Sequence, residues 1–247
     1  MHPDENDQLV VALRAAAREL ADHRSIRDLE QTLGQIVSAA VDTISSVDAG
    51  SISMTGHGRI DTRHPTSDHI RTLDETQSAL REGPCITAIE DPPESGIIVA
   101  QDLAGEDAER WPHFAPQAVE AGYRGLMSTS LSVDGRGRAA LNLYSAAPDA
   151  FGEHCRTLAG LFGIQAALLL YGASEAAHLQ RAVDSRDLIG RAKGILMERF
   201  RTDDQGAFQM LVRSSQDTNM KVIAVAQWLN DTVDAGASRG RRAPAPH

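Results

Sequence analysis

Apolar residues recur at helical spacing early in the chain and then gather in short extended runs. Across 29–44 they fall every three or four positions, which predicts an amphipathic helix, and more polar helical segments are predicted near 69–80 and 114–121. Short apolar or alternating runs, each bordered by Gly, Pro or Asp, predict strands at 50–54, 97–100, 125–133 and 139–144. This order favours an α+β fold in which helices pack on an antiparallel sheet.

The segment 152–200 contains no proline and is predicted to be one helix, interrupted at most by glycines. Within it, apolar residues recur at spacings of three, four or seven, as the seam of a two-stranded coiled coil requires. The seam residues are Leu158, Leu161, Leu168, Ala176, Leu179 and Val183. We therefore expect a homodimer through this helix; the alternative is a helix that only covers the sheet. The apolar stretch 158–171 is too short to span a bilayer, so no membrane association is expected.

Two further short helices are predicted after this one. The sequence T-D-D-Q from Thr202 has the spacing of a capping box and starts the first of them. The second is predicted to begin at Thr218 or Asn219, whose side chains can accept hydrogen bonds from exposed amides. The inward faces of the three helices are predicted from apolar spacing to be Leu188, Ala192 and Ile195, then Phe208, Leu211, Val212 and Ser215, and then Val222, Ile223, Ala226 and Leu229. Together they form a small bundle.

The charge of the chain is unevenly distributed. Its formal net charge is −10, and residues 1–184 carry 14 Arg against 27 acidic residues. Residues 185–235 instead carry seven basic and seven acidic residues, including both lysines of the chain, Lys193 and Lys221. An acidic body repels phosphate backbones, so any contact with nucleic acid must be confined to a local patch and must be sensitive to salt.

The C-terminal helices contain a motif that extends over most of the last quarter of the chain. It consists of I-G-R-A-K-G-I-L-M at 189–197, A-F at 207–208, Leu211, R-S at 213–214, Gln216, Asn219 and V-A at 225–226. These residues resemble an ANTAR domain. The resemblance implies RNA-binding transcription antitermination, in which paired ANTAR domains hold tandem RNA hairpins and thereby disfavour a terminator.

The same motif suggests which residues contact RNA. Specific RNA recognition usually targets hairpin loops, whose unstacked bases expose their edges to polar and basic side chains, and glycine lets a backbone approach closely. The expected RNA-binding residues are Arg186, Gly190, Lys193, Gly194, Arg213, Ser214, Gln216, Asn219 and Lys221. Each of them taken alone is equally well explained as a solvated surface residue. The apolar motif residues are expected in the core: Ala192, Ile195, Leu196, Phe208 and Leu211.

Four phrases in the preceding region resemble GAF domains of the kind that are joined to ANTAR domains. They are E-G-P-C at 82–85, Q-D-L at 101–103, R-W-P-H-F at 110–114 and L-N-L-Y-S at 141–145. The resemblance implies a sensory domain with a small-molecule ligand that it does not identify. Cys85 and Trp111 are the candidate ligand-binding residues; the alternatives are an ordinary buried cysteine and a core aromatic. Asp102 is expected to be a strand-end acid or a cap.

Other chemistries find little support in the sequence. The histidines are scattered without the spacing of metal ligands, and no nucleophile, base and orienting group occur together, so neither a metal, a cofactor nor an enzyme is expected. The acidic opening M-H-P-D-E-N-D-Q is not a secretory signal, and two cysteines fit a reducing cytoplasm.

These patterns predict the following organisation: an N-terminal helix at 1–24, a GAF-like sensory domain at 25–170, a helical linker or coiled coil at 171–186, an ANTAR RNA-binding domain at 187–234 and a disordered tail at 235–247. The expected function is that of a signal-responsive antitermination regulator that binds tandem-hairpin RNA as a dimer. The alternative is a protein-protein adaptor with a small-molecule-sensing GAF domain.

Overall fold

The computed structural model of the protein describes residues 26–56, 59–132 and 139–240, and the chain divides into two compact units between Ala173 and Ser174. The helix predicted at 1–24 lies outside the described residues. Each unit is described below by itself.

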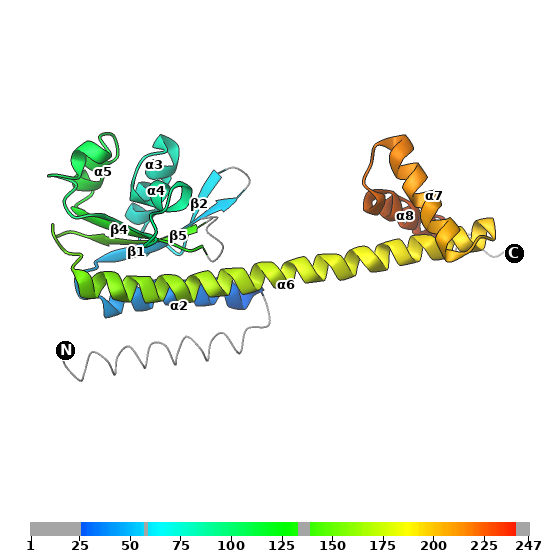
Figure 1. Cartoon of the computed structure of the whole chain (residues 1–247), viewed down its shortest axis with the longest axis horizontal. Coiled ribbons are helices and arrows are strands. Elements are labelled where there is room, and N and C mark those ends of the chain that lie inside the picture. Colours follow the sequence, from blue (N-terminus) through cyan, green and yellow to red (C-terminus); the bar gives the residue numbers. More distant parts are fainter. Residues whose placement is uncertain (1–25, 57–58, 133–138, 241–247) are drawn as a thin grey trace, which may run out of the picture. The chain divides into compact units, whose positions relative to one another are not determined.

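The first unit is built on a five-stranded antiparallel sheet (Figure 1). Its strands are β1 (Ala49–Gly56), β2 (Arg59–Arg63), β3 (Ile97–Ala100), β4 (Gly125–Ser130) and β5 (Ala139–Ser145), in the order β2-β1-β5-β4-β3. Strand β2 was not predicted, because its sequence R-I-D-T-R contains one apolar residue and forms an exposed edge. The antiparallel sheet with flanking helices confirms the predicted α+β fold.

Helices cover both faces of this sheet. Helix α2 (Ile26–Thr43) and the beginning of α6 (Glu153–Phe200) lie on one face, and α3 (Asp68–Leu80), α4 (Pro84–Glu90) and α5 (Ala115–Glu120) lie on the other (Figure 1). A short 3-10 helix, η1 (Ala108–Arg110), precedes α5. Alternation along β5 supplies both cores, because Leu141 and Leu143 join the α2/α6 side while Ala140 and Tyr144 join the other.

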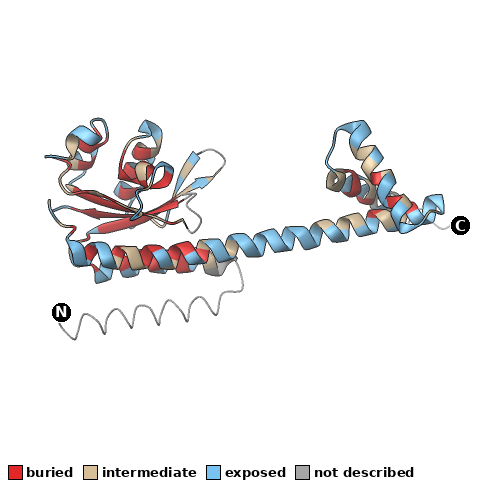
Figure 2. Ribbon diagram, viewed as in Figure 1, coloured by how far each residue is buried: buried red, intermediate tan, exposed pale blue. Residues whose placement is uncertain are grey.

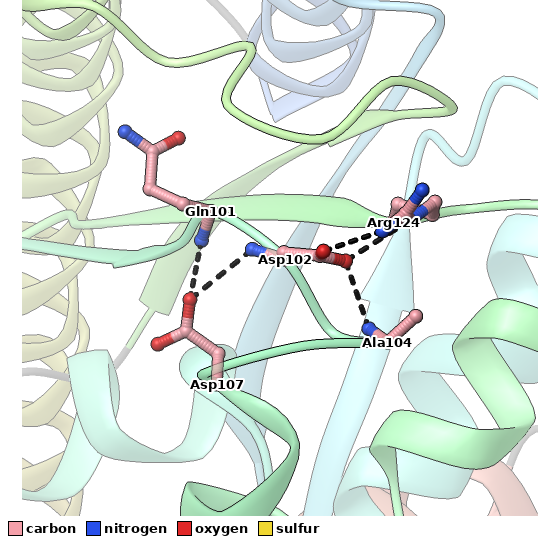
Figure 3. Close-up of polar contacts among 5 residues, drawn as sticks. All are labelled: Gln101, Asp102, Ala104, Asp107 and Arg124. Atoms are coloured by element: carbon pink, nitrogen blue, oxygen red, sulfur yellow. Dashed lines mark hydrogen bonds and ion pairs between the residues drawn. The ribbon is translucent and has the colours of Figure 1, made fainter.

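Two aspartates hold the turn that follows β3 (Figure 3). Oδ1 of Asp102 accepts hydrogen bonds from the backbone N–H of Ala104 at 2.9 Å and from Nε of Arg124 at 3.0 Å, and Arg124 lowers the pKa of this carboxyl group. Asp107 accepts from the backbone N–H groups of Gln101 and Asp102, at 2.6 and 3.2 Å. Asp102 is therefore a loop acid after β3 that stabilises the turn and is paired with a cation, and it caps no described helix.

Helix α6 presents both buried and exposed apolar residues in the first unit. Ala159, Phe162 and Ala166 are buried against the sheet, whereas Ile164 and others point to solvent (Figure 2). Leu158 was predicted to lie in a coiled-coil seam, but it packs partly buried against the sheet core. By length and composition α6 passes as a possible membrane span, because one window of 18 residues within it has a mean hydropathy of 1.4. This is weak evidence, because the core helix of a soluble domain meets the same criterion.

The second unit is a three-helix bundle, as predicted. It consists of the end of α6 with α7 (Asp204–Thr218) and α8 (Val222–Gly240). Its core is small and aliphatic: Ala192, Leu196, Ala207, Leu211, Val225 and Ala226. Helix α8 ends inside the segment 235–247 for which composition predicts disorder, and residues 241–247 lie outside the described residues.

Three local predictions for this bundle were wrong. The N-cap of α7 is Asp203, whose side chain accepts from the N–H of Gly206 at 2.8 Å, and not Thr202. Helix α8 begins at Val222 and not at Thr218 or Asn219. Phe208 was expected in the core but is 42% exposed, because α7 buries Ala207 in its place, next to Leu211, which is buried as predicted.

Candidate functional site

A groove of about 720 Å³ runs along α6 in the second unit. Its described lining residues are Ala182, Ser185, Arg186, Asp187, Ile189, Gly190, Arg191 and Lys193. The groove brings together three of the residues predicted to bind RNA: Arg186, Gly190 and Lys193. It adds Arg191, from which sequence reasoning drew nothing although its charge was a usable signal. Three cations against the single carboxylate of Asp187 make the groove locally basic within an acidic chain.

The glycines of α6 leave one part of this helix surface bare. Gly190 and Gly194 are both exposed, and a Cβ atom added to either would meet nothing within 4 Å. Glycine inside a helix costs about 0.5–1 kcal/mol relative to alanine. Since packing within the unit does not require these glycines, they suit the close approach of another molecule to the helix backbone.

Lys193 is engaged in an ion pair within the bundle. Its ammonium group contacts the carboxylate of Asp204 in the first turn of α7, and only 21% of the Lys193 side chain is exposed, against 71% for Asp204. Lys193, which lines the groove, is therefore held in place by an acid that would compete with a phosphate. This contact spans the turn between two helices and was not predicted.

The other predicted RNA-binding residues are Gly194 on α6 and residues of α7 and of the turn after it, and none of them lines the groove as far as its described walls extend. Arg213, Gln216 and Lys221 are exposed, and Ser214 is half-buried. Asn219 caps α7 in the left-handed region, at φ 53°, and its N–H donates to the carbonyls of Ser215 and Gln216. Its conformation therefore gives Asn219 a structural role in addition to an exposed side chain.

The first unit contains a buried polar cluster between α3 and the sheet. Asp74 on α3 is 2% exposed, and its carboxylate accepts hydrogen bonds from Ser51 at 2.6 Å, Tyr144 at 2.6 Å and Asn142 at 3.2 Å. Asn142 also donates to Ser53 at 3.0 Å and accepts from Ser128 at 2.8 Å. Strand residues spaced by two place these polar groups on one face, whereas the intervening leucines point to the other core.

Gln77 connects this cluster to the start of α4. Its Nε2 donates to the Tyr144 hydroxyl at 3.1 Å, and its Oε1 accepts from the backbone N–H of Cys85 at 3.0 Å. Gly83, at φ 134°, permits this approach, because a Cβ there would lie 2.2 Å from Oε1 of Gln77. Glu82 in the same motif accepts from the backbone N–H groups of His113 and Phe114, at 2.7 and 2.9 Å, and so ties this loop to the start of α5.

The electrostatics of the cluster follow from its burial. Burial raises the pKa of Asp74 to about 6, and hydrogen bonds from Ser51 and Tyr144 oppose this shift. Burial and the nearby Asp74 raise the pKa of Cys85 to about 12, so its thiol stays protonated and unreactive at neutral pH. These properties agree with the ordinary buried cysteine that the sequence left open.

The sequence pointed to Trp111 but not to the polar cluster. Trp111 is 5% exposed, packs in the core on this side of the sheet, and carries the guanidinium of Arg110 at 4.2 Å from its ring centre, as a core aromatic would. Asp74 and Gln77 were missed, although their spacing from Ile70 places them on the inward face of α3. Throughout the described residues, no group of three or more His, Cys, Asp or Glu side chains is placed to hold a metal ion.

Comparison with known proteins identifies the C-terminal unit. Residues 177–229 match the family model of the ANTAR domain, so the chain carries an ANTAR domain there. No curated protein is significantly similar to the chain.

Among solved structures, a bacteriophytochrome from the photosynthetic bacterium R. palustris is similar with a TM-score of 0.53 and 14% identity, over 83% of this chain and 46% of that one. The GAF domain of an Acinetobacter phosphoenolpyruvate-protein phosphotransferase has a TM-score of 0.49 and 16% identity, and the match covers 72% of this chain and 99% of that one. The corresponding GAF domain from Coxiella burnetii has a TM-score of 0.49 and 18% identity, and the match covers 68% of this chain and 96% of that one. At these identities the similarities concern the fold alone.

Proposed function

We propose that this ANTAR-domain protein is a signal-responsive transcription antitermination regulator that binds a tandem-hairpin RNA as a homodimer in the cytoplasm. The observation that carries the proposal is the groove on α6, which lies inside the ANTAR match and gathers Arg186, Arg191 and Lys193 beside exposed Gly190. Cations next to a bare stretch of helix suit a phosphate backbone that must come close to the protein.

Because the rest of the chain is acidic, attraction to phosphate is limited to the groove, and tight binding also needs specific contacts to the RNA. Each neutralised phosphate of a single strand contributes about −0.7 to the slope of log affinity against log salt. The polar side chains of Arg213 and Gln216 on α7 and of Asn219 after it are exposed and suit the base edges of a hairpin loop. Affinity from the groove and specificity from these polar residues together favour a hairpin over a plain duplex.

Exposed apolar residues on α6 support the dimer. In the first unit Ile164, Leu168 and Tyr171 are 60%, 43% and 49% exposed, at spacings of four and three. In the second unit Leu179 and Val183, spaced by four, are 69% and 54% exposed. A second copy of α6 is the natural cover for such a stripe, since it carries the same stripe. A two-fold dimer then presents two equivalent RNA sites to two hairpins.

The buried polar cluster around Asp74 is where we place the sensory response. A signal acts only if it has different affinity for two arrangements of the dimer. The cluster connects α3, α4 and strands β1 and β5 through hydrogen bonds, so a small molecule or a proton that alters it perturbs the packing of the whole sensory domain.

The decisive experiment is a salt-titrated gel shift against a two-hairpin RNA, its single-hairpin half and a DNA duplex. Arg186→Gln removes a groove cation, and Arg181→Gln is the matched control, since Arg181 is exposed on the same helix and does not belong to the described groove lining. We expect tight binding to the two-hairpin RNA only, weakened by Arg186→Gln with a salt slope reduced by about 1, and little change for the control.

Equal affinity for all three nucleic acids, or equal effects of the two arginine variants, would contradict RNA recognition by this groove. That result would favour the alternative function, a protein-protein adaptor. A pull-down in which both arginine variants still retain the protein partner would support the adaptor.

A further inference from the structure

Most aromatic residues of the first unit are buried, with Tyr171 at 49% exposure as an exception, whereas those of the second unit are exposed. In the first unit Trp111, Phe114, Tyr144 and Phe151 are at most 5% exposed. In the second unit the core is aliphatic, and all three Phe, Tyr and Trp residues of its sequence lie at the surface: Phe200 at 56%, Phe208 at 42% and Trp228 at 65% exposure. The bundle therefore displays aromatic side chains that it does not use for its own packing.

Trp228 is the most exposed of the three and lies on the outer side of α8. The inner side of this helix is already occupied, because Val225 and Ala226 are buried in the core and Asn230 donates to the carbonyl of Leu188 at 3.0 Å. At about 100° per residue, Trp228 lies on the opposite side of the helix from Ala226 and Asn230, and it aligns with Lys221, seven positions earlier and directly before α8. An exposed indole and one of the two lysines of the chain thus share one face.

We propose that Trp228 is a stacking platform for an unpaired base of the RNA, with Lys221 contacting the adjacent phosphate. The inference rests on the proposed RNA-binding function and adds a contact surface that is separate from the groove on α6. Aromatic side chains stack on the faces of splayed bases, and every base offers such a face. The platform therefore selects unpaired over paired nucleotides and tolerates several bases at that position.

The neighbours of Trp228 favour RNA over a second protein as the occupant. Within one turn along α8 the exposed residues are polar, namely Gln227, Asp231 and Thr232. A protein hot spot is normally enclosed by packed neighbours, whereas a base needs only the ring face. Asp231 repels phosphate on the C-terminal side of the ring, which directs the RNA backbone toward Lys221.

The two tryptophans make the proposal directly measurable. In a Trp111→Phe background, whose folding is checked by circular dichroism, Trp228 is the only tryptophan left. Titration with the two-hairpin RNA should quench its fluorescence with the same midpoint as the gel shift. The same RNA with its loop bases closed into duplex should leave the emission unchanged. Free N-acetyltryptophanamide corrects for absorption by the RNA.

Variants separate stacking from bulk and from folding. Trp228→Ala should weaken binding by about 5- to 100-fold, which is the typical range for loss of one stacked base. Trp228→Phe should recover most of this loss, and Gln227→Ala, an exposed neighbour, should bind like the unchanged protein. Because Trp228 is 65% exposed, thermal unfolding should change little in either tryptophan variant.

The possible failures are distinguishable. Wild-type affinity of Trp228→Ala together with unquenched emission overturns the platform and leaves the proposed function intact. Absence of RNA binding by the unchanged protein overturns both. Emission that shifts with protein concentration in the absence of RNA, and does not respond to RNA, shows that a second copy covers Trp228 and also overturns the platform.

Discussion

The hydroxyl of Tyr144 donates a 2.6 Å hydrogen bond to Oδ1 of Asp74 at a point where neither side chain reaches solvent. Ser51, Asn142 and Thr62 also hydrogen-bond this carboxylate, and all of these partners are neutral. A buried negative charge that is balanced only by dipoles is costly, and the cost changes with pH. The relationship therefore links the stability of the first unit to protonation of Asp74.

Asp74→Asn should change how stability depends on pH. The pKa of Asp74 is raised from 3.8 to about 6, so the protonated form favours folding, and this stabilisation is fully present below pH 3.8 and lost as pH rises through 6. The full difference is about 3 kcal/mol, of which about 1 kcal/mol falls between pH 5 and 7.5. Urea unfolding gives the free energy of unfolding of both proteins at these two pH values. The unchanged protein should lose about 1 kcal/mol more between them than Asp74→Asn does. Parallel profiles would contradict it.

Asp204→Asn should strengthen RNA binding. The carboxylate of Asp204 pairs with Lys193 and competes with phosphate for it. Removing this acid should raise affinity by up to about fivefold at low salt, since an exposed ion pair is worth up to about 1 kcal/mol, and the gain should fade as salt increases. Asp217→Asn is the matched control, an exposed acid on the same helix. Equal gains in both variants would indicate a general charge effect instead.

Gly194→Ala should raise stability while lowering RNA affinity. The added methyl group meets nothing within 4 Å, so the variant should gain about 0.5–1 kcal/mol in the free energy of unfolding. If RNA approaches the backbone at Gly194, the same methyl group weakens binding in a gel shift. Gly172→Ala is the control, because its Cβ is equally unobstructed but lies outside the ANTAR match. A stabilised Gly194→Ala variant with unchanged RNA affinity would remove Gly194 from the interface.

Asn219 allows its structural and RNA-binding roles to be separated. Its left-handed conformation suits Asn and Gly, so Asn219→Ala should cost about 1–2 kcal/mol of stability, whereas Asn219→Gly should be nearly neutral. A contact between the Asn219 amide and RNA predicts that the stable Gly variant nevertheless binds RNA more weakly. Thermal unfolding and a gel shift on the same samples decide between the two roles.

Ile164→Glu combined with Leu168→Glu should separate the proposed dimer without unfolding the first unit. Both side chains are exposed, at 60% and 43%, and charges on facing helices repel. Light scattering should show a monomer, and the preference for two hairpins over one should be lost. Thr157→Glu, at an exposed polar position on the same helix, should stay dimeric. A double variant that remains dimeric would show that another surface holds the two copies together.

The sequence by itself determined the elements whose signals are local. The helical period predicted α2, the absence of proline predicted the unbroken α6, and the motif from Ile189 to Met197 identified the ANTAR domain before any coordinates. Such features depend on residues within a few positions of one another, so they can be read along the chain. The short helix α4 and the edge strand β2 were not predicted, because each is short and β2 contains only one apolar residue.

Only the tertiary structure decided which distant side chains meet. Asp74 and Tyr144 are 70 positions apart, and nothing in either neighbourhood marks them as partners. The rotation of α7 exposed Phe208 and buried Ala207, and the turn after α6 placed Asp204 against Lys193. Periodicity defines the faces of a helix, but packing between helices and strands decides which face is buried and which polar groups are paired, and those contacts are set by residues far apart in the chain.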